Sequence, residues 1–381
     1  MFVLFQKMLE NCSKPNFSPA QASDILMRLY DLTTSQIHPL PSYDDQNFYV
    51  SSTNGNEYVL KISNSEDSKN PTVIEVQTFA MSFLHENGIP TQKGIFTVTG
   101  QLMSIHELDC GFGLQKYLVR LLSYLPGKII SKVPLTPQLL YETGKMAAKI
   151  DKVLQKVFSD CLYMFPLLKP IPTNCFIFQM EHPSISVLDR DNFNWKLSNL
   201  PALEKSLFVL DGERLQEVVK SVIGLFKSFV APKYPYFRKC INHGDFNDFN
   251  VLVQPDNNGI YKICGIIDFG DMNSGFYIHE LATAIMHMMV IHPNPIEVGG
   301  AVLAGWESEL PLNNSERDSL YVLVLSRFCQ TVCYVRQSLL TQPENEYLIM
   351  WSKRVEHILW DFWKLNKEHV EITWFHDAHL Q

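Results

Sequence analysis

The sequence predicts an α+β fold, β-rich before about residue 125 and mainly helical after it. Two β-rich segments flank Asn54 and Gly55, a pair that favours a tight type I′ hairpin. A second strand-rich stretch runs from residue 240 to 271, with a polar loop between its first two strands. Elsewhere after residue 125, apolar residues recur mostly at helical spacing. These three observations predict the fold class.

Composition limits the classes of function. The chain has 381 residues, 46% hydrophobic and 19% charged, which is typical of a globular protein with a substantial core. Its formal net charge of -8 argues against a protein that binds the phosphate backbone of nucleic acid. The same charge suits a small cationic substrate.

The chain start and the cysteines predict the compartment. The opening MFVLFQKMLENCSK has an apolar run of five residues and no basic region, so we expect neither a signal peptide nor a membrane span. The 8 cysteines form no CxxC pair and no zinc-spaced cluster, and we expect them to be reduced in a cytoplasmic protein. Cys329 and Cys333 lie one helical turn apart, which predicts a buried helix face.

The chain is predicted to open with a helix. Ser18 fits the N-cap position, Pro19 the first helical position and Gln21 the third position of a capping box. The apolar residues that follow lie on one face.

A lysine lies in the second strand of the predicted hairpin, within YVLKIS. Alternation along the strand places Lys61 and Val59 on one face and Leu60 on the other. A lysine that faces inward is costly unless it is paired. We expect its partner to be Glu75, in the helical segment VIEVQTFAMSFL; an exposed strand lysine is the alternative.

The polar loop after residue 240 carries the groups that phosphoryl transfer needs. Asp245 precedes Asn250 by five residues, so a tight loop can direct Asp245 at an acceptor hydroxyl while Asn250 presents an amide oxygen to a metal ion. Asp268, at the end of a later strand, supplies a second, charged metal ligand. The alternative is that these side chains only cap turns.

These motifs resemble a known superfamily. HGDxxxxN, with seventeen residues between Asn250 and Asp268 in IDFGD, resembles the aminoglycoside phosphotransferase and choline kinase superfamily. The resemblance implies a protein-kinase-like fold, with Asp245 as catalytic base, Mg²⁺ on Asn250 and Asp268, and Lys61 on the nucleotide phosphates with Glu75 as its partner.

The resemblance extends to the nucleotide site. The loop SYDDQN takes the place of the glycine-rich flap of kinases, so Asn47 or backbone amides would cover the phosphates. The strand KYLVRLLSYLPGK resembles the hinge between kinase lobes. This resemblance implies a small β-rich lobe over residues 1–124 and a larger, mainly helical lobe over residues 125–381, and it places Tyr124 and Leu125 beside the nucleotide base.

Several motifs are narrower than the superfamily. SYDDQNF and VGGAVLAGWES resemble the hydroxylysine kinase family, and the likeness extends from about residue 13 to about residue 374. It implies GTP as phosphoryl donor and the side-chain hydroxyl of 5-hydroxy-L-lysine as acceptor. The apolar, proline-rich segment over residues 159–180 departs from the family pattern.

Hydroxylysine is a zwitterion with an additional ammonium group, so its site needs carboxylates for two amines and a cation for its carboxylate. The acidic candidates are Asp44, Asp45, Asp248 and Asp271. Arg327, inside an otherwise apolar helix, is the cationic candidate, and an internal salt bridge is its alternative role. Spacing does not rank these residues.

Two other functions stay open. One is a kinase for another small amino alcohol such as choline, ethanolamine or homoserine, and the other is a pseudokinase that binds nucleotide without catalysis. The expected partners are a nucleotide and a small cationic amino acid, with no nucleic acid and no membrane. The sequence sets neither the oligomeric state nor, on physical grounds, the choice between GTP and ATP.

Overall fold

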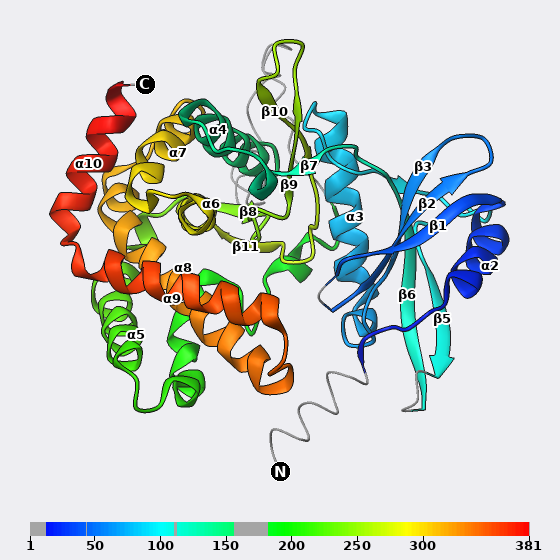
Figure 1. Cartoon of the computed structure of the whole chain (residues 1–381), viewed down its shortest axis with the longest axis horizontal. Helices are drawn as coiled ribbons and strands as arrows, with labels where there is room; N and C mark the ends of the chain where they lie inside the picture. The colour runs from blue at the N-terminus through cyan, green and yellow to red at the C-terminus, as the bar shows by residue number, and fades with distance from the viewer. Residues whose placement is uncertain (1–12, 43, 110–112, 156–181, 381) are drawn as a thin grey trace, which may run out of the picture. The chain divides into compact units, whose positions relative to one another are not determined.

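The computed structural model describes residues 13–42, 44–109, 113–155 and 182–380 (Figure 1). These residues form two compact units. Unit 1 combines residues 1–129 with 251–270 and 334–352, and unit 2 holds the remaining segments, residues 130–250, 271–333 and 353–381. The segment 159–180 that departs from the family pattern lies outside the described residues.

Unit 1 is built around an antiparallel sheet. Its strands run in the order β1-β2-β3-β6-β4, and β5 also pairs with β6. The elements are α2 (Pro19–Tyr30), β1 (Thr34–Leu40), β2 (Gln46–Ser52), β3 (Glu57–Ile62), α3 (Pro71–Glu86), β4 (Gly94–Ile95), β5 (Ser104–Asp109) and β6 (Leu114–Ser123).

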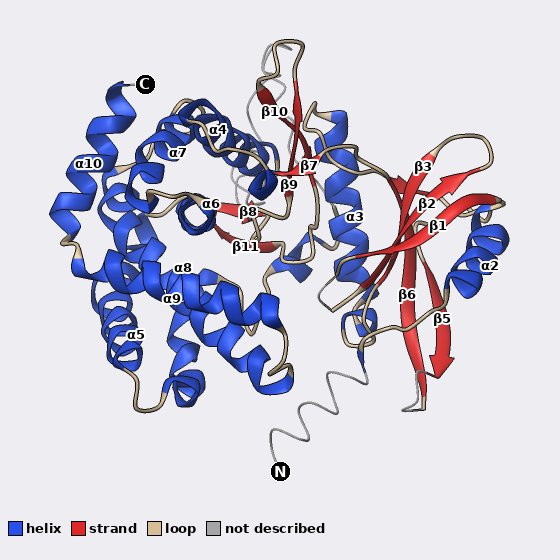
Figure 2. Ribbon diagram, in the orientation of Figure 1, coloured by secondary structure: helices blue, strands red, loops and turns tan. Residues whose placement is uncertain are grey.

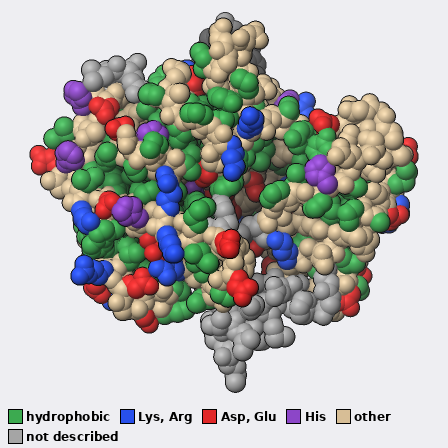
Figure 3. All heavy atoms as spheres, viewed as in Figure 1, with side chains coloured by type: hydrophobic (Ala, Val, Ile, Leu, Met, Phe, Trp, Pro, Cys, Tyr) green, Lys and Arg blue, Asp and Glu red, His purple; other side chains and the backbone are tan. Residues whose placement is uncertain are grey.

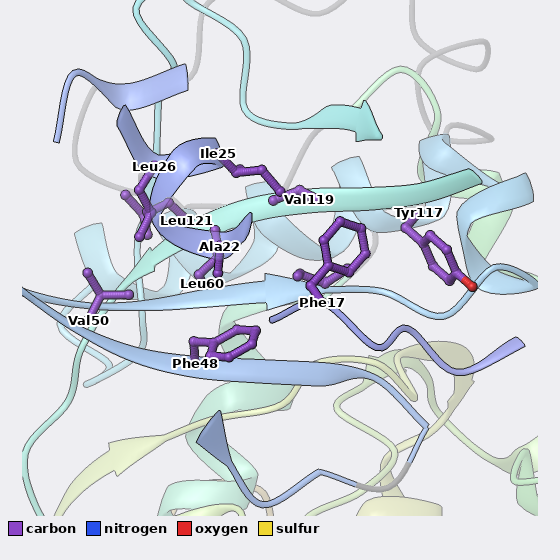
Figure 4. Packing of buried hydrophobic residues seen from close by; sticks show 11 residues of the cluster. Phe17, Ala22, Ile25, Leu26, Phe48, Val50, Leu60, Tyr117, Val119 and Leu121 are labelled. Atoms are coloured by element: carbon purple, nitrogen blue, oxygen red, sulfur yellow. The ribbon is translucent and has the colours of Figure 1, made fainter. Parts of the chain in front are cut away.

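Two helices lie on opposite sides of this sheet (Figure 1). Helix α2 begins with the predicted capping box, in which Gln21 N–H donates to Ser18 Oγ and Ser18 N–H donates to Gln21 Oε1. Its buried residues pack against alternate residues of β2, β3 and β6, as Figure 4 shows for Leu26, Leu60 and Leu121. The other face of the sheet, which carries Lys61, is therefore left for α3.

The register fixes which side chains share that second face. Asn47 on β2 pairs with Lys61 on β3, and Lys61 pairs with Arg120 on β6. Directly opposed residues of antiparallel strands project from the same face. The predicted alternation is confirmed, since Leu60 and Ile62 join the core on the α2 side.

The β2–β3 hairpin is confirmed, but its predicted type I′ turn is wrong. That turn needs positive φ at both central residues, and of the pair only Gly55, at φ 83, has it. Ser52 N–H donates to Asn56 O at 2.9 Å, so the loop has three residues with Gly55 last. A single left-handed glycine at that place is typical of a three-residue loop.

The predicted strand-rich stretch is divided between the two units. In unit 1, β9 (Val251–Pro255) pairs with β10 (Tyr261–Ile266) on one side and with β7 (Lys128–Ile129) on the other. In unit 2, β8 (Lys239–Asn242) pairs with β11 (Asn273–Phe276). The strands of this stretch therefore belong to two different sheets.

Unit 2 is mainly helical (Figure 2). Its α-helices are α4 (Pro137–Val153), α5 (Arg214–Leu225), α6 (Tyr277–Ile291), α7 (Val298–Glu307), α8 (Asn314–Thr341), α9 (Glu346–Lys364) and α10 (Lys367–Leu380), of which α8 and α9 extend into unit 1. Segments of 3-10 helix run over Ile185–Leu188, Leu197–Leu210 and Ala231–Tyr236. Among the helices that the structure describes, none is long and apolar enough to cross a membrane.

Close helix packing explains part of the VGGAVLAGWES motif. A Cβ atom on Gly144 of α4 would lie 1.9 Å from Val302 O, and one on Gly305 of α7 would lie 1.8 Å from Tyr141 O. Only glycine permits this approach. In α8, Cys329 and Cys333 are buried, which confirms the predicted helix face.

Acidic and basic side chains are interspersed with apolar ones on the face seen in Figure 3. The net charge of -8 is therefore not gathered into one acidic region on that face.

Candidate active site

In unit 2, Asp245 lies in the loop after β8, and amide side chains hold its carboxylate. Oδ2 accepts hydrogen bonds from Asn247 Nδ2 and from Asn250 Nδ2, both at 2.8 Å. Asn250 Nδ2 also donates to the backbone carbonyl of Asp245 at 3.0 Å. Because the amide nitrogen of Asn250 is used in this way, its oxygen is left as an acceptor for another group.

Gly244 permits the tight turn before Asp245. It has φ +83, and a Cβ atom at this position would lie 2.4 Å from the backbone carbonyl oxygen of Asp271. Both facts exclude a larger residue without a backbone shift. The glycine of HGD is thus a packing requirement of this loop.

A buried arginine lies behind the loop. Arg327 of α8 is 1% exposed, and its Nη2 lies 3.6 Å from Asp245 Oδ1. It also donates to Gly244 O at 3.3 Å and to Trp195 O at 3.0 Å. These contacts favour the internal salt bridge over the substrate carboxylate as its role.

Glu280 of α6 supports the same loop. Its Oε2 accepts a hydrogen bond from Gly244 N–H at 3.0 Å. Burial raises the pKa of Glu280, and the Asp245 charge adds to the effect, while the Gly244 hydrogen bond and Arg327 oppose it. Its nearby buried carboxyl, Asp151, likewise has a pKa raised by burial and by Glu280. The two carboxyls thus disfavour simultaneous ionisation.

In unit 1, Asp268 follows β10. Its φ of 60 is left-handed, which is uncommon for a residue with a side chain and is often found at functional positions. Its side chain is 45% exposed, and Oδ1 accepts a hydrogen bond from Lys61 Nζ at 3.1 Å. Gln77 of α3 donates to Gly270 O at 2.8 Å, so α3 is tied to the turn after Asp268.

Lys61 is buried and has two carboxylate partners. Its Nζ lies 3.1 Å from Asp45 Oδ2 as well as 3.1 Å from Asp268 Oδ1. Burial acts to lower the pKa of Lys61, but Asp268 and Asp45 outweigh it, and the net shift is upward. Lys61 is therefore a permanent cation in this site.

The predicted ion pair between Lys61 and Glu75 is wrong. Glu75 is exposed and lines a cavity of about 610 Å³ together with Phe96 and Leu118. The helix around Glu75 was predicted correctly, but its rotation turns Gln77 towards the Asp268 turn in place of the glutamate. Residues three and four apart share a helix face, whereas residues two apart do not.

The other predicted nucleotide residues lie in unit 1. Asn47 is half-buried in the row with Lys61, and its Oδ1 has no hydrogen-bond partner among the described residues. Tyr124 N–H donates to Glu57 O at 3.2 Å. Leu125 packs with Leu252 around Gly265, where each leucine has a methyl carbon 3.1 Å from the place of a glycine Cβ.

The predicted acceptor residues fall in both units. Asp44 is exposed in unit 1, whereas Asp248 and Asp271 belong to unit 2. Asp248 is 1% exposed, and its Oδ1 lies 4.0 Å from His287 Nδ1. Burial raises the pKa of Asp248 to about 6 and lowers that of His287, so the histidine stays neutral. Asp271 is half-buried beside the Gly244 turn.

The candidate metal ligands are oxygen atoms. Asp268 offers a carboxylate and Asn250 an amide oxygen, the donor types that Mg²⁺ prefers. Groups of three or more His, Cys, Asp or Glu side chains that could hold a metal are absent among the described residues. A magnesium ion that completes its shell with phosphates and water needs only one or two protein ligands. The donor chemistry therefore fits.

Three residues of the Lys61 environment were missed or misassigned. Asp45 was expected among the substrate carboxylates, and Arg120 and Gln77 were not predicted at all. Arg120 is the lone charge in the buried half of strand β6 and is 2% exposed, so a charge inside an apolar strand was an available signal. Gln77 and Asp45 carry no such signal.

Comparisons with known proteins agree with this chemistry. The model of the phosphotransferase enzyme family matches residues 36–319. A hydroxylysine kinase of Danio rerio is 52% identical over 96% of this chain and 97% of its own length. A hydroxylysine kinase of Bos taurus is 43% identical over 96% of this chain and 94% of its own length.

Solved structures confirm the predicted fold class. An amicoumacin kinase solved with AMP-PNP and Ca²⁺ has a TM-score of 0.59 at 13% identity and covers 91% of this chain and 94% of its own. A microcompartment-associated aminopropanol kinase also has a TM-score of 0.59, at 15% identity, and covers 91% and 97%. The fold, the motifs and these likenesses together place the chain in the phosphotransferase enzyme family and, within it, in the hydroxylysine kinase family.

Proposed function

We propose that this phosphotransferase transfers the γ-phosphoryl group of GTP to the side-chain hydroxyl of 5-hydroxy-L-lysine, giving 5-phosphohydroxylysine and GDP. An alcohol acceptor follows from the family. The identity of the acceptor is supported by likeness to hydroxylysine kinases over 96% of the chain. The choice of GTP is supported only by the resemblance to that family.

Asp245 carries the chemical proposal. Two amide donors fix one of its oxygens, and Arg327 lies on the side of the other, so the carboxylate is held in one orientation. In the reaction the acceptor oxygen forms a bond to the γ-phosphorus as the bond from that phosphorus to the β,γ-bridging oxygen breaks. Asp245 accepts the proton of the hydroxyl and passes it to solvent.

The nucleotide is proposed to bind in unit 1. Lys61 neutralises phosphate charge, and the amide nitrogen of Asn47, in the same row of the sheet, is proposed to donate to a phosphate oxygen. Tyr124 and Leu125 flank the base. Asn250 and Asp268 would hold Mg²⁺, which when bound neutralises charge on the β- and γ-phosphates.

The acceptor needs groups for two ammoniums and one carboxylate. Asp248 and Asp271 are proposed for the ammonium groups because both belong to the unit that carries Asp245. Asp44 is the exposed alternative. Arg327 is proposed to hold Asp245, and binding of the substrate carboxylate is its second possible role.

A nucleotide-release assay tests the proposal. Purified protein is given Mg-GTP or Mg-ATP with 5-hydroxy-L-lysine, lysine, choline, ethanolamine or homoserine, and release of the nucleoside diphosphate is followed. We expect stimulation by hydroxylysine and none by lysine, because only hydroxylysine has the acceptor hydroxyl. Stimulation by another amino alcohol alone would favour the other-acceptor alternative. Nucleotide binding with no stimulation at all would favour the pseudokinase.

A further inference from the structure

The face of the unit 1 sheet that carries Lys61 holds a second cation. Asn47, Lys61 and Arg120 form a row across β2, β3 and β6, each directly opposite the next. Side chains opposed in this way project from one face. Two permanent cations therefore stand in neighbouring positions on the nucleotide side of the sheet.

Arg120 is fastened to helix α3. It is 2% exposed, its Nη1 donates to Thr78 Oγ1 at 2.6 Å, and the same nitrogen lies 3.4 Å from Ile74 O. Thr78 Oγ1 in turn donates to Ile74 O at 2.7 Å. Burial of an arginine whose direct partners are a hydroxyl and a carbonyl is costly, so this contact requires an account beyond packing.

Asp45 is fixed at both of its oxygens. Oδ2 lies 3.1 Å from Lys61 Nζ, and Oδ1 accepts hydrogen bonds from Asn64 N–H at 2.9 Å and Asn64 Nδ2 at 3.3 Å. Its side chain is 17% exposed. A carboxylate held in this way presents a fixed negative charge to Lys61.

The charges around Lys61 explain why both Asp45 and Arg120 are needed. Lys61 and Arg120 supply two positive charges, and Asp45 and Asp268 supply two negative charges. Asp67 also acts on Arg120, and these carboxylates together lower the cost of burying the two cations. Glu75, which points to the cavity beside Phe96, contributes nothing to this balance.

We propose that Asp45 and Arg120 are the positioning residues of Lys61, in place of the glutamate on helix α3. Asp45 holds the ammonium group of Lys61 directly. Arg120 fixes β6, the strand that pairs with β3 at Lys61, against α3 through its hydrogen bond to Thr78. The inference rests on the proposed function, because it assumes that Lys61 binds the phosphates of a nucleotide.

The test compares nucleotide binding across matched variants of the full chain. Asp45→Asn removes the charge and keeps the shape. Thr78→Val removes the hydroxyl that Arg120 contacts, and Thr78→Ser keeps it. Glu75→Gln removes the glutamate of α3, and Glu66→Gln is the surface control, since Glu66 pairs with Lys69 in the same unit.

Dissociation constants are measured by titration with fluorescent analogues of GTP and ATP, with and without Mg²⁺, and the tighter analogue is used throughout. We expect Asp45→Asn and Thr78→Val to weaken binding about tenfold or more, which corresponds to about 1.4 kcal/mol. Thr78→Ser, Glu75→Gln and Glu66→Gln should stay within about twofold of wild type. The KM for hydroxylysine should not change, whereas a general loss of structure would change it and the thermal midpoint together.

Equal weakening by Glu75→Gln and Asp45→Asn, or binding by both Asp45→Asn and Thr78→Val at the wild-type level, would overturn the inference. The proposed function is judged separately by turnover. A wild-type chain that binds nucleotide without phosphorylating hydroxylysine contradicts that function, while the ratios of dissociation constants still decide the role of Asp45 and Arg120. A wild-type chain that binds no nucleotide contradicts both.

Discussion

The Asp245 loop and the Lys61 cluster both supply charged groups for phosphoryl transfer, but they are built differently. Asp245 takes two of its hydrogen bonds from Asn247 and Asn250, two and five residues along the chain. Lys61 takes one of its partners, Asp268, from 207 residues away. The first arrangement is a property of a short segment, and the second exists only in the folded sheet.

The comparison teaches where spacing is informative. A polar loop closes on itself through side-chain to backbone hydrogen bonds, so its spacing predicts its geometry. An ion pair between distant segments depends on strand register and helix rotation, and the rotation of α3 turns Gln77, not Glu75, towards the turn after Asp268. The following variants test this difference, beginning with the largest expected effect.

Removal of the carboxylate from the local loop should nearly abolish turnover. Asp245→Ala is expected to lower kcat by about 10²–10⁴-fold, the range for loss of a general base, while nucleotide binding in unit 1 is retained. Steady-state kinetics and nucleotide titration measure the two effects. Asp256→Ala is the matched control, because Asp256 also accepts hydrogen bonds within its own turn but belongs to the β9–β10 hairpin. Wild-type turnover by Asp245→Ala would remove the assigned base.

Arg327 contacts the Asp245 loop from a distant part of the chain. Its substitution therefore shows how far the geometry of the loop depends on distant contacts. Arg327→Met leaves the carbonyls of Gly244 and Trp195 without their donor, which should lower the free energy of unfolding by roughly 1–3 kcal/mol. We expect kcat to fall, since Asp245 loses its neighbouring cation, with the KM for hydroxylysine within about twofold. A raised KM at unchanged kcat would instead indicate that Arg327 binds the substrate carboxylate.

Alanine substitutions at Gly244 and Gly259 separate two costs, the backbone strain of a positive φ and the close contact of a new Cβ atom. Gly244→Ala combines a positive φ, which costs roughly 1–2 kcal/mol, with a Cβ atom 2.4 Å from Asp271 O. Gly259→Ala has the same kind of φ, +77, with no atom within 4 Å of its Cβ. Thermal unfolding of both variants should show the larger loss for Gly244→Ala, and only that variant should also lose kcat. Equal losses of stability would mean that the close contact between the new Cβ atom and Asp271 O is relieved by a shift of the backbone.

The free energy of unfolding at acid pH tests the packing behind the catalytic loop and not the permanently charged Lys61 cluster. His279 of α6 is buried against the ring of Phe276, and burial lowers its pKa to about 3. A depressed pKa contributes stability that is present above the ordinary value of about 6.5 and is lost as pH falls towards the folded value. At pH 5 the loss is about 2 kcal/mol, from about 1.4 kcal/mol per pKa unit.

His279→Phe should remove that loss. The two ring nitrogens of His279 have no hydrogen-bond partner among the described residues. Phenylalanine therefore replaces a buried polar ring by an apolar one of similar shape. Denaturant unfolding at pH 7.5 and pH 5 should give a smaller difference for His279→Phe than for wild type. The exposed His357→Phe is the control. An unchanged pH dependence would show that His279 is accessible to protons in the folded state.

The residues that the sequence predicted best share one property. The predicted capping box of Ser18 and Gln21 is confirmed, and Asp245 and Asn250 lie in one tight loop, as their spacing predicts. The roles of Asp245 in catalysis and of Asn250 in metal binding stay predictions. Strands β2, β3 and β6 of the small sheet were also predicted, because alternation of apolar residues reports which face is buried, whereas β1, β4 and β5 were not.

The residues that sequence reasoning could not assign depend on tertiary geometry. Asp45 and Asp44 are adjacent acidic residues in one loop, and nothing local distinguishes the partner of Lys61 from its exposed neighbour. The division of the 240–271 stretch into two sheets depends on pairing of β9 with β7 and of β8 with β11, segments far apart in the chain. Long-range pairing of this kind is not encoded in periodicity.

Identification of the product tests the central claim most directly. Wild type and Asp245→Ala are incubated with GTP, Mg²⁺ and 5-hydroxy-L-lysine, and the acceptor is analysed by ³¹P NMR and mass spectrometry. The account predicts a phosphate monoester on the side-chain hydroxyl with wild type and none with Asp245→Ala. Unmodified hydroxylysine from a wild-type chain that binds nucleotide, or the same ester from Asp245→Ala at the wild-type rate, would contradict it.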